Sequence, residues 1–493
     1  MLSLCRRLTC TSLLIGAFSL SPAWAGEVTL VFTSTMADIE PVADEGSLPQ
    51  LATLLHKERE VGPTLFLHGG ASLAAGVLSS FDKGSHMIDL LNDLQPDAMA
   101  VTKRDLAFGE DELTLRSYEA RFPFLSANAI DRETGKVLEG LEQDLLLERG
   151  GVKIGVVAAT SPELTIQYIV PRIEVQPPAQ TVTDRAQALR EAGAQAVVAI
   201  VDNADEDVAE LRRNGVVDVL VQVAATGRDS VETDASGAFI VHSNVKGTAV
   251  VLRLRHDEAE DSLTMAGEVA QLAGMPAETQ MAGRVSAYLD RLSELLDIQV
   301  GTTRTALDTR REVIRAEETP FASLVADAMR SLLNADIALI NGGSIRGNRL
   351  YEAGTPLTRR DIQRELPFRD FITTVPVTGA ALREALELSA SGVETLKGSF
   401  LHPSNMKVVY DLSRPAGSRV ERVEIAGKPL DPAAVYKVAM TGYLAKGGDG
   451  YAMLAAKDDI PRDDGKLLWE IMAHYISEQG VIAPGIDGRI VLR

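Results

Sequence analysis

Short apolar runs rich in β-branched residues alternate with helix-like stretches through the first half of this 493-residue chain. Strands separated by helices in this way are typical of βαβ units around a buried sheet. We therefore predict an α/β architecture for residues 27–255, with residues 237–254 forming a closing antiparallel pair. The predicted strands are 28–32, 64–67, 152–159, 196–201 and 216–223, and the predicted helices are 48–58, 85–94, 110–120, 181–192 and 205–213.

A change of pattern divides the chain near its middle. Residues 257–277 are acidic and mixed, which favours a linker. Apolar side chains in 285–296 then recur with helical spacing, so we predict a connecting helix over 278–297. The predicted organisation is a first domain over 26–256, a linker and helix over 257–300, and a second mixed α/β domain over 301–493. A chain of this length is expected to form more than one domain.

The first 25 residues have the organisation of an export signal. Arg6 and Arg7 precede a short apolar run, and Ala23-Trp24-Ala25 forms a cleavage pattern before Gly26. The run is too short for a spanning helix, and later stretches stay below about 20 apolar residues. We predict a cleaved signal peptide over 1–25 and a periplasmic protein. The arginine pair leaves the general secretory and twin-arginine routes both open.

Composition restricts the partners and the chemistry. Both cysteines, Cys5 and Cys10, lie in the predicted signal, so residues 26–493 have no disulfide and no thiolate metal ligand. Removal of the signal deletes two arginines and no acid, which takes the formal net charge from −20 to −22. Such a charge argues against nucleic-acid polymers and anionic lipid as partners. An anionic small molecule would need a local basic pocket.

Four stretches in the second half combine groups suited to a nucleotide. Asn341 ends an apolar strand and is followed by two glycines, where a ligand can approach the backbone closely. Arg346 offers a planar donor fork for phosphate or carboxylate, and Asp449 lies in a glycine-rich loop where it can accept ribose hydroxyls. Phe368 and Tyr443 supply flat faces for a purine. The stretches are TRREVIRAEETPFASLVADAMR (309–330), LINGGSIRGNRL (339–350), LTRRDIQRELPF (357–368) and MTGYLAKGGDGY (440–451).

Together these stretches resemble the C-terminal domain of the 5′-nucleotidase family, in the family's order and over about 190 residues. The resemblance implies a metallophosphoesterase-like β-sandwich with flanking helices, a connecting helix and a C-terminal α/β domain. It also implies a nucleotide-binding set, in which Tyr443 replaces the more usual Phe; Ser323 stands where the family often has Asn. Taken singly, these residues could also be core, turn or solvated residues. The implied set is Arg315, Asn341, Arg346, Phe368, Tyr443 and Asp449.

The same resemblance implies two divalent metal ions in the N-terminal domain, yet their ligands are missing. Thr35, Ala37, Ala71, Lys103, Arg104, Ala107, Asn203, Ala224 and Thr226 stand at the expected ligand and catalytic positions. We therefore predict no metal, no cofactor and no catalytic residue. A rearranged metal site from Asp38, His68, Asp105, Asp202 and Asp205 remains an alternative.

Lys103 and Arg104 occupy the place where the metals would be held. One hypothesis is that they bind a phosphate without hydrolysing it, because Arg makes charge-assisted bonds to such groups. The alternative is that they face solvent or pair with Asp105.

Three functions follow from the sequence. The first is a periplasmic family member that binds a nucleotide or nucleoside without metal-dependent hydrolysis. The second is an active nucleotide hydrolase, or a relative of the thiosulfohydrolases, with a rearranged metal site. The third is an interaction protein with a vestigial pocket. Loss of a two-metal site favours the first, because it removes the attacking hydroxide and the charge clamp together.

Overall fold

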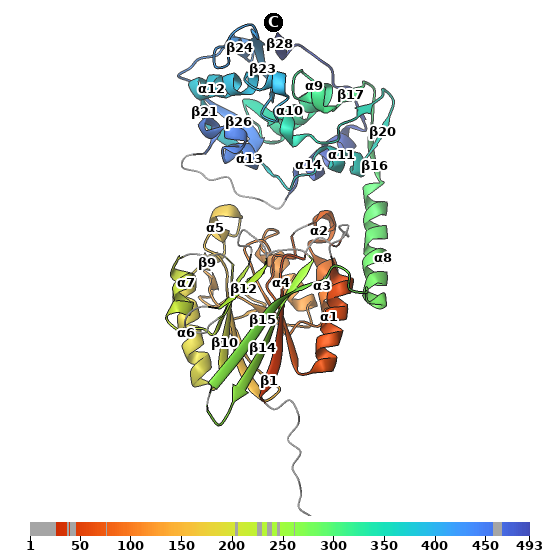
Figure 1. Cartoon of the computed structure of the whole chain (residues 1–493). Coiled ribbons are helices and arrows are strands. Elements are labelled where there is room, and N and C mark those ends of the chain that lie inside the picture. Colours follow the sequence, from red (N-terminus) through yellow and green to blue (C-terminus); the bar gives the residue numbers. More distant parts are fainter. Residues whose placement is uncertain are drawn as a thin grey trace, which may run out of the picture.

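In the computed structural model, two bodies lie at opposite ends of one long helix (Figure 1). The structure describes residues 26–36, 39, 46–74, 76–202, 206–223, 229–233, 239–243, 247–260, 262–456 and 466–493. The predicted signal peptide, 1–25, lies outside these residues. Within the described part of the chain, no helix combines the length and apolar character that a membrane span requires.

The first body is a sandwich of two sheets, which confirms the predicted fold class. One sheet has the order β15 (Ser262–Gln271), β14 (Thr248–Asp257), β1 (Glu27–Thr33), β2 (Thr64–His68), β3 (Ala98–Ala100), β4 (Phe124–Leu125), β6 (Leu141–Glu142). The other has the order β12 (Ser230–Thr233), β13 (Phe239–Ser243), β11 (Val219–Val223), β10 (Ala196–Asp202), β8 (Val152–Ala159), β7 (Asp144–Arg149). Side chains from the facing sides of both sheets, such as Leu30 and Val198, form one buried cluster.

Helices cover the outer faces of the sandwich. Apolar residues of α1 (Leu48–Val61) and α3 (Ser85–Leu94) pack on the outer side of β1–β3. Those of α6 (Pro178–Glu191) and α7 (Glu206–Arg213) pack on β8 and β10. Strands buried on both faces account for the continuous apolar runs in the sequence. The remaining elements are α2 (Val77–Asp82), α4 (Glu110–Glu119), α5 (Leu164–Gln167) and the pair β5 (Ala129–Asp131) and β9 (Ile173–Val175).

The predicted linker begins too early. Residues 262–271 form the edge strand β15, which pairs antiparallel with β14 over its full length. One face of β15 is partly buried, because Leu263, Met265 and Val269 pack against the core of the sandwich. The predicted pairing within 237–254 is also wrong, since β13 pairs with β11 and β12 instead. The strand was missed because the charged and small residues of β15 make its alternation of apolar and polar side chains hard to recognise in the sequence.

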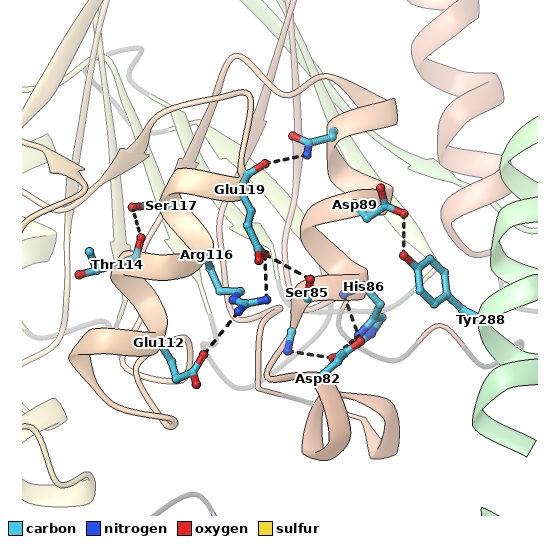
Figure 2. A network of polar contacts seen from close by, with 12 residues as sticks. Asp82, Ser85, His86, Asp89, Glu112, Thr114, Arg116, Ser117, Glu119 and Tyr288 are labelled. Atoms are coloured by element: carbon cyan, nitrogen blue, oxygen red, sulfur yellow. Dashed lines mark hydrogen bonds and ion pairs between the residues drawn. The ribbon is translucent and has the colours of Figure 1, made fainter. Parts of the chain in front are cut away.

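The connecting helix α8 (Thr279–Leu296) is fastened to the first body. Tyr288 donates a hydrogen bond to Asp89 of α3, with 2.6 Å between the oxygens, and Arg284 forms an ion pair with the same carboxylate. Figure 2 shows Tyr288 pointing from α8 to Asp89. Nearby, the imidazole of His86 in α3 lies 2.9 Å from the carboxylate of Asp82, the last residue of α2. The helix therefore forms part of the first body's surface.

The second body contains two four-stranded sheets and a smaller three-stranded sheet. The first has the order β21 (Ile372–Thr378), β26 (Val435–Thr441), β18 (Ile337–Asn341), β22 (Leu401–Ser404). The second is β25 (Lys428–Pro429), β24 (Val420–Ile425), β23 (Met406–Tyr410), β28 (Ile490–Leu492), and the third is β20 (Pro356–Thr358), β16 (Gln299–Thr303), β27 (Val481–Ile482). The other elements are β17 (Leu307–Asp308), β19 (Leu350–Tyr351), α9 (Arg311–Ile314), α10 (Pro320–Leu332), α11 (Arg359–Glu365), α12 (Gly379–Ala390), α13 (Gly442–Ala445) and α14 (Leu468–Gln479).

The two bodies also touch away from α8. The ring of Phe81 in α2 lies 5.7 Å from that of Trp469 in α14, and the guanidinium carbon of Arg359 lies 5.5 Å from the Phe81 ring centre. In the described residues, no sheet has strands from both bodies. The exact domain boundaries therefore stay a prediction, except that 262–271 belongs with the first sandwich.

Candidate functional site

The carboxylate of Asp105 holds together the loops after β2 and β3. It accepts backbone N–H groups from Ala71, Ser72, Leu73 and Thr102 at 2.8–3.0 Å. It also accepts the Thr102 hydroxyl at 2.7 Å. The Asp105 side chain is buried. Its bond to the Ala71 N–H helps to hold Ala71 in a left-handed conformation, with φ 58°, which non-glycine residues seldom adopt. The alternative pairing of Asp105 with Lys103 or Arg104 is therefore wrong.

His68, at the end of β2, is equally occupied. Its Nδ1 lies 3.1 Å from the Thr33 hydroxyl and its Nε2 lies 2.8 Å from the Ser72 hydroxyl. Complete burial lowers the pKa of His68 to about 4, against the opposing charge of Asp105. The imidazole is neutral near pH 7, and both of its nitrogens are engaged by protein hydroxyls.

The structure separates the two candidate anion-binding residues. The ammonium of Lys103 forms an ion pair with Glu163, and its backbone N–H donates to the buried carboxylate of Asp202 at 2.6 Å. Burial raises the pKa of Asp202, although the bond from Lys103 opposes this shift. Arg104 is exposed, and among the described residues its guanidinium makes no ion pair. Of these two residues, Arg104 alone presents a cationic head without an ion pair to another described residue.

The described residues at this edge do not fit two divalent cations. Such ions need several carboxylate, imidazole or amide ligands. The carboxylates of Asp105 and Asp202 and the imidazole of His68 are already bonded to other groups of the protein. No group of three or more His, Cys, Asp or Glu suited to a metal occurs within the ranges that the structure describes. Ala37, Asp38, Asn203, Asp205, Ala224 and Thr226 lie outside those ranges.

In the second body, three predicted residues form one hydrogen-bonded unit. The Asn341 amide donates to Oδ2 of Asp449 at 2.7 Å, and the Tyr443 hydroxyl donates to Oδ1 of the same carboxylate at 2.8 Å. Asp449 has φ 55°, a left-handed conformation that aims its carboxylate between these partners. A Cβ on Gly448 would lie 2.4 Å from the Tyr443 ring, so the tight loop requires glycine there.

The second aromatic residue carries a cation on its face. The guanidinium carbon of Arg346 lies 5.1 Å from the centre of the Phe368 ring. Phe368 and Tyr443 are each 46% exposed, so each ring has surface available to a ligand. Asp370 links the two rings: its N–H donates to the Phe368 carbonyl at 2.9 Å, and its carboxylate accepts the Tyr443 N–H at 3.2 Å.

Arg311, Arg315 and Arg346 gather beside this unit, and none of them forms an ion pair with another described residue. Burial lowers the pKa of the Arg315 guanidinium, and the nearby positive charges of Arg311 and Arg346 lower it further. One nitrogen of Arg315 donates to the Leu396 carbonyl at 3.1 Å, whereas its buried Nε has no hydrogen-bond partner among the described residues. Asp449 is the acid that opposes the lowering. A cluster of this kind suits an anion.

All six predicted nucleotide-binding residues thus come together in space. Sequence reasoning missed Arg311, which stands four residues before Arg315 in the motif that carried the prediction. It also missed Asp370, whose pKa burial raises to about 6. Arg311 could have been identified from its spacing of four residues before Arg315. Asp370 follows Phe368 by two residues, and no sequence pattern marks it as part of the site.

Comparison with known proteins places these features in a wider context. The family model of the 5′-nucleotidase C-terminal domain matches residues 299–456. The 5′-nucleotidase of Homo sapiens is 25% identical over 97% of this chain and 93% of its own, and the snake venom 5′-nucleotidase of Crotalus adamanteus is 26% identical over 90% and 82%.

Solved structures have the same fold. The 5′-nucleotidase precursor of Thermus thermophilus aligns with a TM-score of 0.58 at 24% identity, covering 94% of this chain and 99% of that one. The NAD nucleotidase of Haemophilus influenzae aligns with a TM-score of 0.63 at 15% identity, covering 95% and 99%. The sulfate thiohydrolase SoxB of Thermus thermophilus aligns with a TM-score of 0.55 at 17% identity, covering 96% and 97%.

Proposed function

Since the chain belongs to the 5′-nucleotidase family, we propose that it is a periplasmic protein that binds a nucleotide or nucleoside in its C-terminal half without metal-dependent phosphate hydrolysis. The observation that carries this proposal is the assembly of Asn341, Asp449 and Tyr443 beside Arg346 and Phe368. It contains a hydrogen-bond acceptor, two ring faces and a cation within one small region.

Each component has a role in ligand binding. The purine lies between the rings of Phe368 and Tyr443, each stacking contact contributing roughly 1–3 kcal/mol. Asp449 accepts the ribose hydroxyls with the lone pairs left over from Asn341 and Tyr443. Arg346, with Arg311 and Arg315, provides the local positive charge that a phosphate needs in a chain of formal charge −20.

The N-terminal half lacks the groups for the family's metal chemistry at the described positions. Two metals would clamp the phosphate and generate a hydroxide near neutral pH. The side chains of Ala71, Lys103, Arg104 and Ala107 supply no metal ligand of the required kind. A typical enzyme lowers its barrier by more than about 8 kcal/mol, and neither Lys103 nor Arg104 activates water.

Binding is tested by calorimetric titration of the full chain with AMP, adenosine and inorganic phosphate. We expect saturable binding of AMP, and a loss of about tenfold or more in Phe368→Ala, because one stacking contact is removed. Tyr118→Ala removes an exposed ring of the N-terminal half and serves as the matched control. If the parent binds none of the three ligands saturably, the pocket is vestigial. That result would support the alternative function, an interaction protein.

Catalysis is tested separately. The purified protein is analysed for metal content and assayed for phosphate release from AMP, ADP and UDP-sugars with added Mn²⁺, Co²⁺ or Zn²⁺. We expect no stoichiometric metal and no release above a sample without protein. Tightly held metal with release of phosphate would instead establish the alternative, an active hydrolase with a rearranged site that includes residues outside the described ranges.

The periplasmic location rests on residues 1–25, whose charged start, apolar run and Ala-x-Ala pattern have the form of a cleaved signal. Fractionation of cells that produce the full chain, with N-terminal sequencing of the product, tests it. We expect a periplasmic product that begins at Gly26; a cytoplasmic product that begins at Met1 would contradict the proposal.

A further inference from the structure

Glu365, the last residue of α11, is an acid with no exposed surface. Among the described residues its carboxylate makes no ion pair; it accepts the Thr309 hydroxyl at 3.1 Å and the Gly347 N–H at 3.1 Å. Burial raises the pKa of Glu365, although these bonds and the charge of Arg349 oppose the rise. A buried acid that forms no ion pair is costly unless hydrogen bonds compensate for its burial.

The bond from Gly347 ties Glu365 directly to the segment that carries Arg346, and the bond from Thr309 ties it indirectly, because Thr309 also accepts the N–H of Arg349. The carboxylate holds the N–H of Gly347, and the backbone carbonyl of Glu365 accepts the N–H of Arg346 at 2.8 Å. A Cβ on Gly347 would lie 1.9 Å from the Glu365 carboxylate, so the two residues are fitted to each other. One residue thus fixes two consecutive peptide groups at the base of the exposed Arg346 side chain.

A second chain of bonds extends from Glu365 to the other arginines. Thr309, which donates to Glu365, also accepts the N–H of Arg349 at 3.2 Å. Between them, Asn348 accepts the N–H of Arg311 through its side chain at 2.9 Å. The segment 346–349 is therefore tied on one side to Glu365 and on the other to the start of α9, four residues before Arg315.

We propose that Glu365 is a positioning residue that holds Arg346 over Phe368 and toward Arg311 and Arg315, and so sets the affinity of this site for the phosphate of a nucleotide. The inference deepens the proposed function and rests on it. Glu365 does not touch the ligand. Its effect therefore has to pass through Arg346, and it concerns a phosphorylated ligand more than the corresponding nucleoside.

The test is a double-mutant cycle with AMP and adenosine as probes. The proteins are the parent, Glu365→Gln, Arg346→Ala and the double variant. Glu387→Gln is the matched control, because the Glu387 carboxylate also accepts two backbone N–H groups, those of Arg419 and Val420, on the far side of the same domain. Thr309→Val, a milder change to the same network, replaces Glu365→Gln if that variant does not fold.

We expect Glu365→Gln to weaken AMP about tenfold and adenosine less than twofold, and to have little further effect in the Arg346→Ala background. The control should bind both probes as the parent does. Equal losses for AMP and adenosine, or the same loss with and without Arg346, would overturn the inference while leaving the proposed function intact. A parent that binds neither probe would refute the proposed function and this inference with it.

Discussion

Replacement of Asp370 by Asn tests whether a partly buried charge is held against the backbone of Tyr443. The Asp370 carboxylate accepts the Tyr443 N–H at 3.2 Å. Burial raises its pKa to about 6, against opposing bonds from Thr441, Tyr443 and Phe371 and the charge of Lys446. Asparagine keeps one acceptor oxygen and nearly the same shape, but cannot ionise.

The sign of the effect follows from proton binding. The folded pKa of Asp370 lies above the ordinary value of 3.8, so the native state binds more protons than the unfolded state between about pH 4 and 6. The free energy of unfolding therefore falls as pH rises through this window. A shift of about two units corresponds to about 3 kcal/mol. Loss of one acceptor costs about 1 kcal/mol, so Asp370→Asn should be more stable than the parent by about 1–2 kcal/mol near pH 8.

The assay is urea unfolding of both proteins at several pH values between about 4 and 8. The stability advantage of the variant should disappear near pH 4 and grow until about pH 6.5. Asp431→Asn, which changes an exposed carboxylate of the same domain, should show no such trend. A difference between Asp370→Asn and the parent that stays constant across this range, or that shrinks as pH rises, would refute the reasoning.

Three other changes have expected outcomes. Phe81→Ala should shift the emission of Trp469 to longer wavelength, because it removes the ring that covers the one tryptophan outside the predicted signal peptide; an unchanged spectrum would contradict that contact. Lys103→Ala should lower the free energy of unfolding by less than about 1 kcal/mol, because Glu163 is 44% exposed, and AMP binding by this variant should match the parent. Asp449→Ala should weaken adenosine and AMP by similar factors in calorimetric titrations; an effect confined to AMP would assign Asp449 to the phosphate rather than the ribose.

Regular elements were predictable where one pattern dominates. The helix over 85–94 and the strand over 152–159 were predicted from their apolar patterns and have those bounds in the structure. The edge strand 262–271 was missed, because a strand with one solvated face and several charges resembles a linker in sequence. A periodic apolar pattern reflects which side chains are buried, and few side chains of this edge strand are buried.

The candidate site shows the same division between local and non-local information. Asn341 and Asp449 were identified from motifs that contain them, and their direct bond adds what the motifs could not give. Glu365 and Asp105 were not identified in their observed roles, because each acts on backbone N–H groups of a segment distant in sequence. Almost every residue has a backbone N–H group, so the sequence does not show which of them will bond to a given carboxylate.

The hydrogen bonds around the Asp105 carboxylate also bear on whether phosphatase chemistry can be engineered into the N-terminal half. An acid introduced at position 71 would place a second carboxylate beside Asp105, whose oxygens already bond the N–H groups of residues 71–73. The new residue would also have to adopt the left-handed backbone conformation of Ala71, with φ 58°, which the same hydrogen bonds hold in place. Repulsion between the two acids would loosen the turn before any metal arrived. Restoration of an acid at position 71 alone should therefore be harmful, and a functional centre would need compensating changes around Asp105 as well.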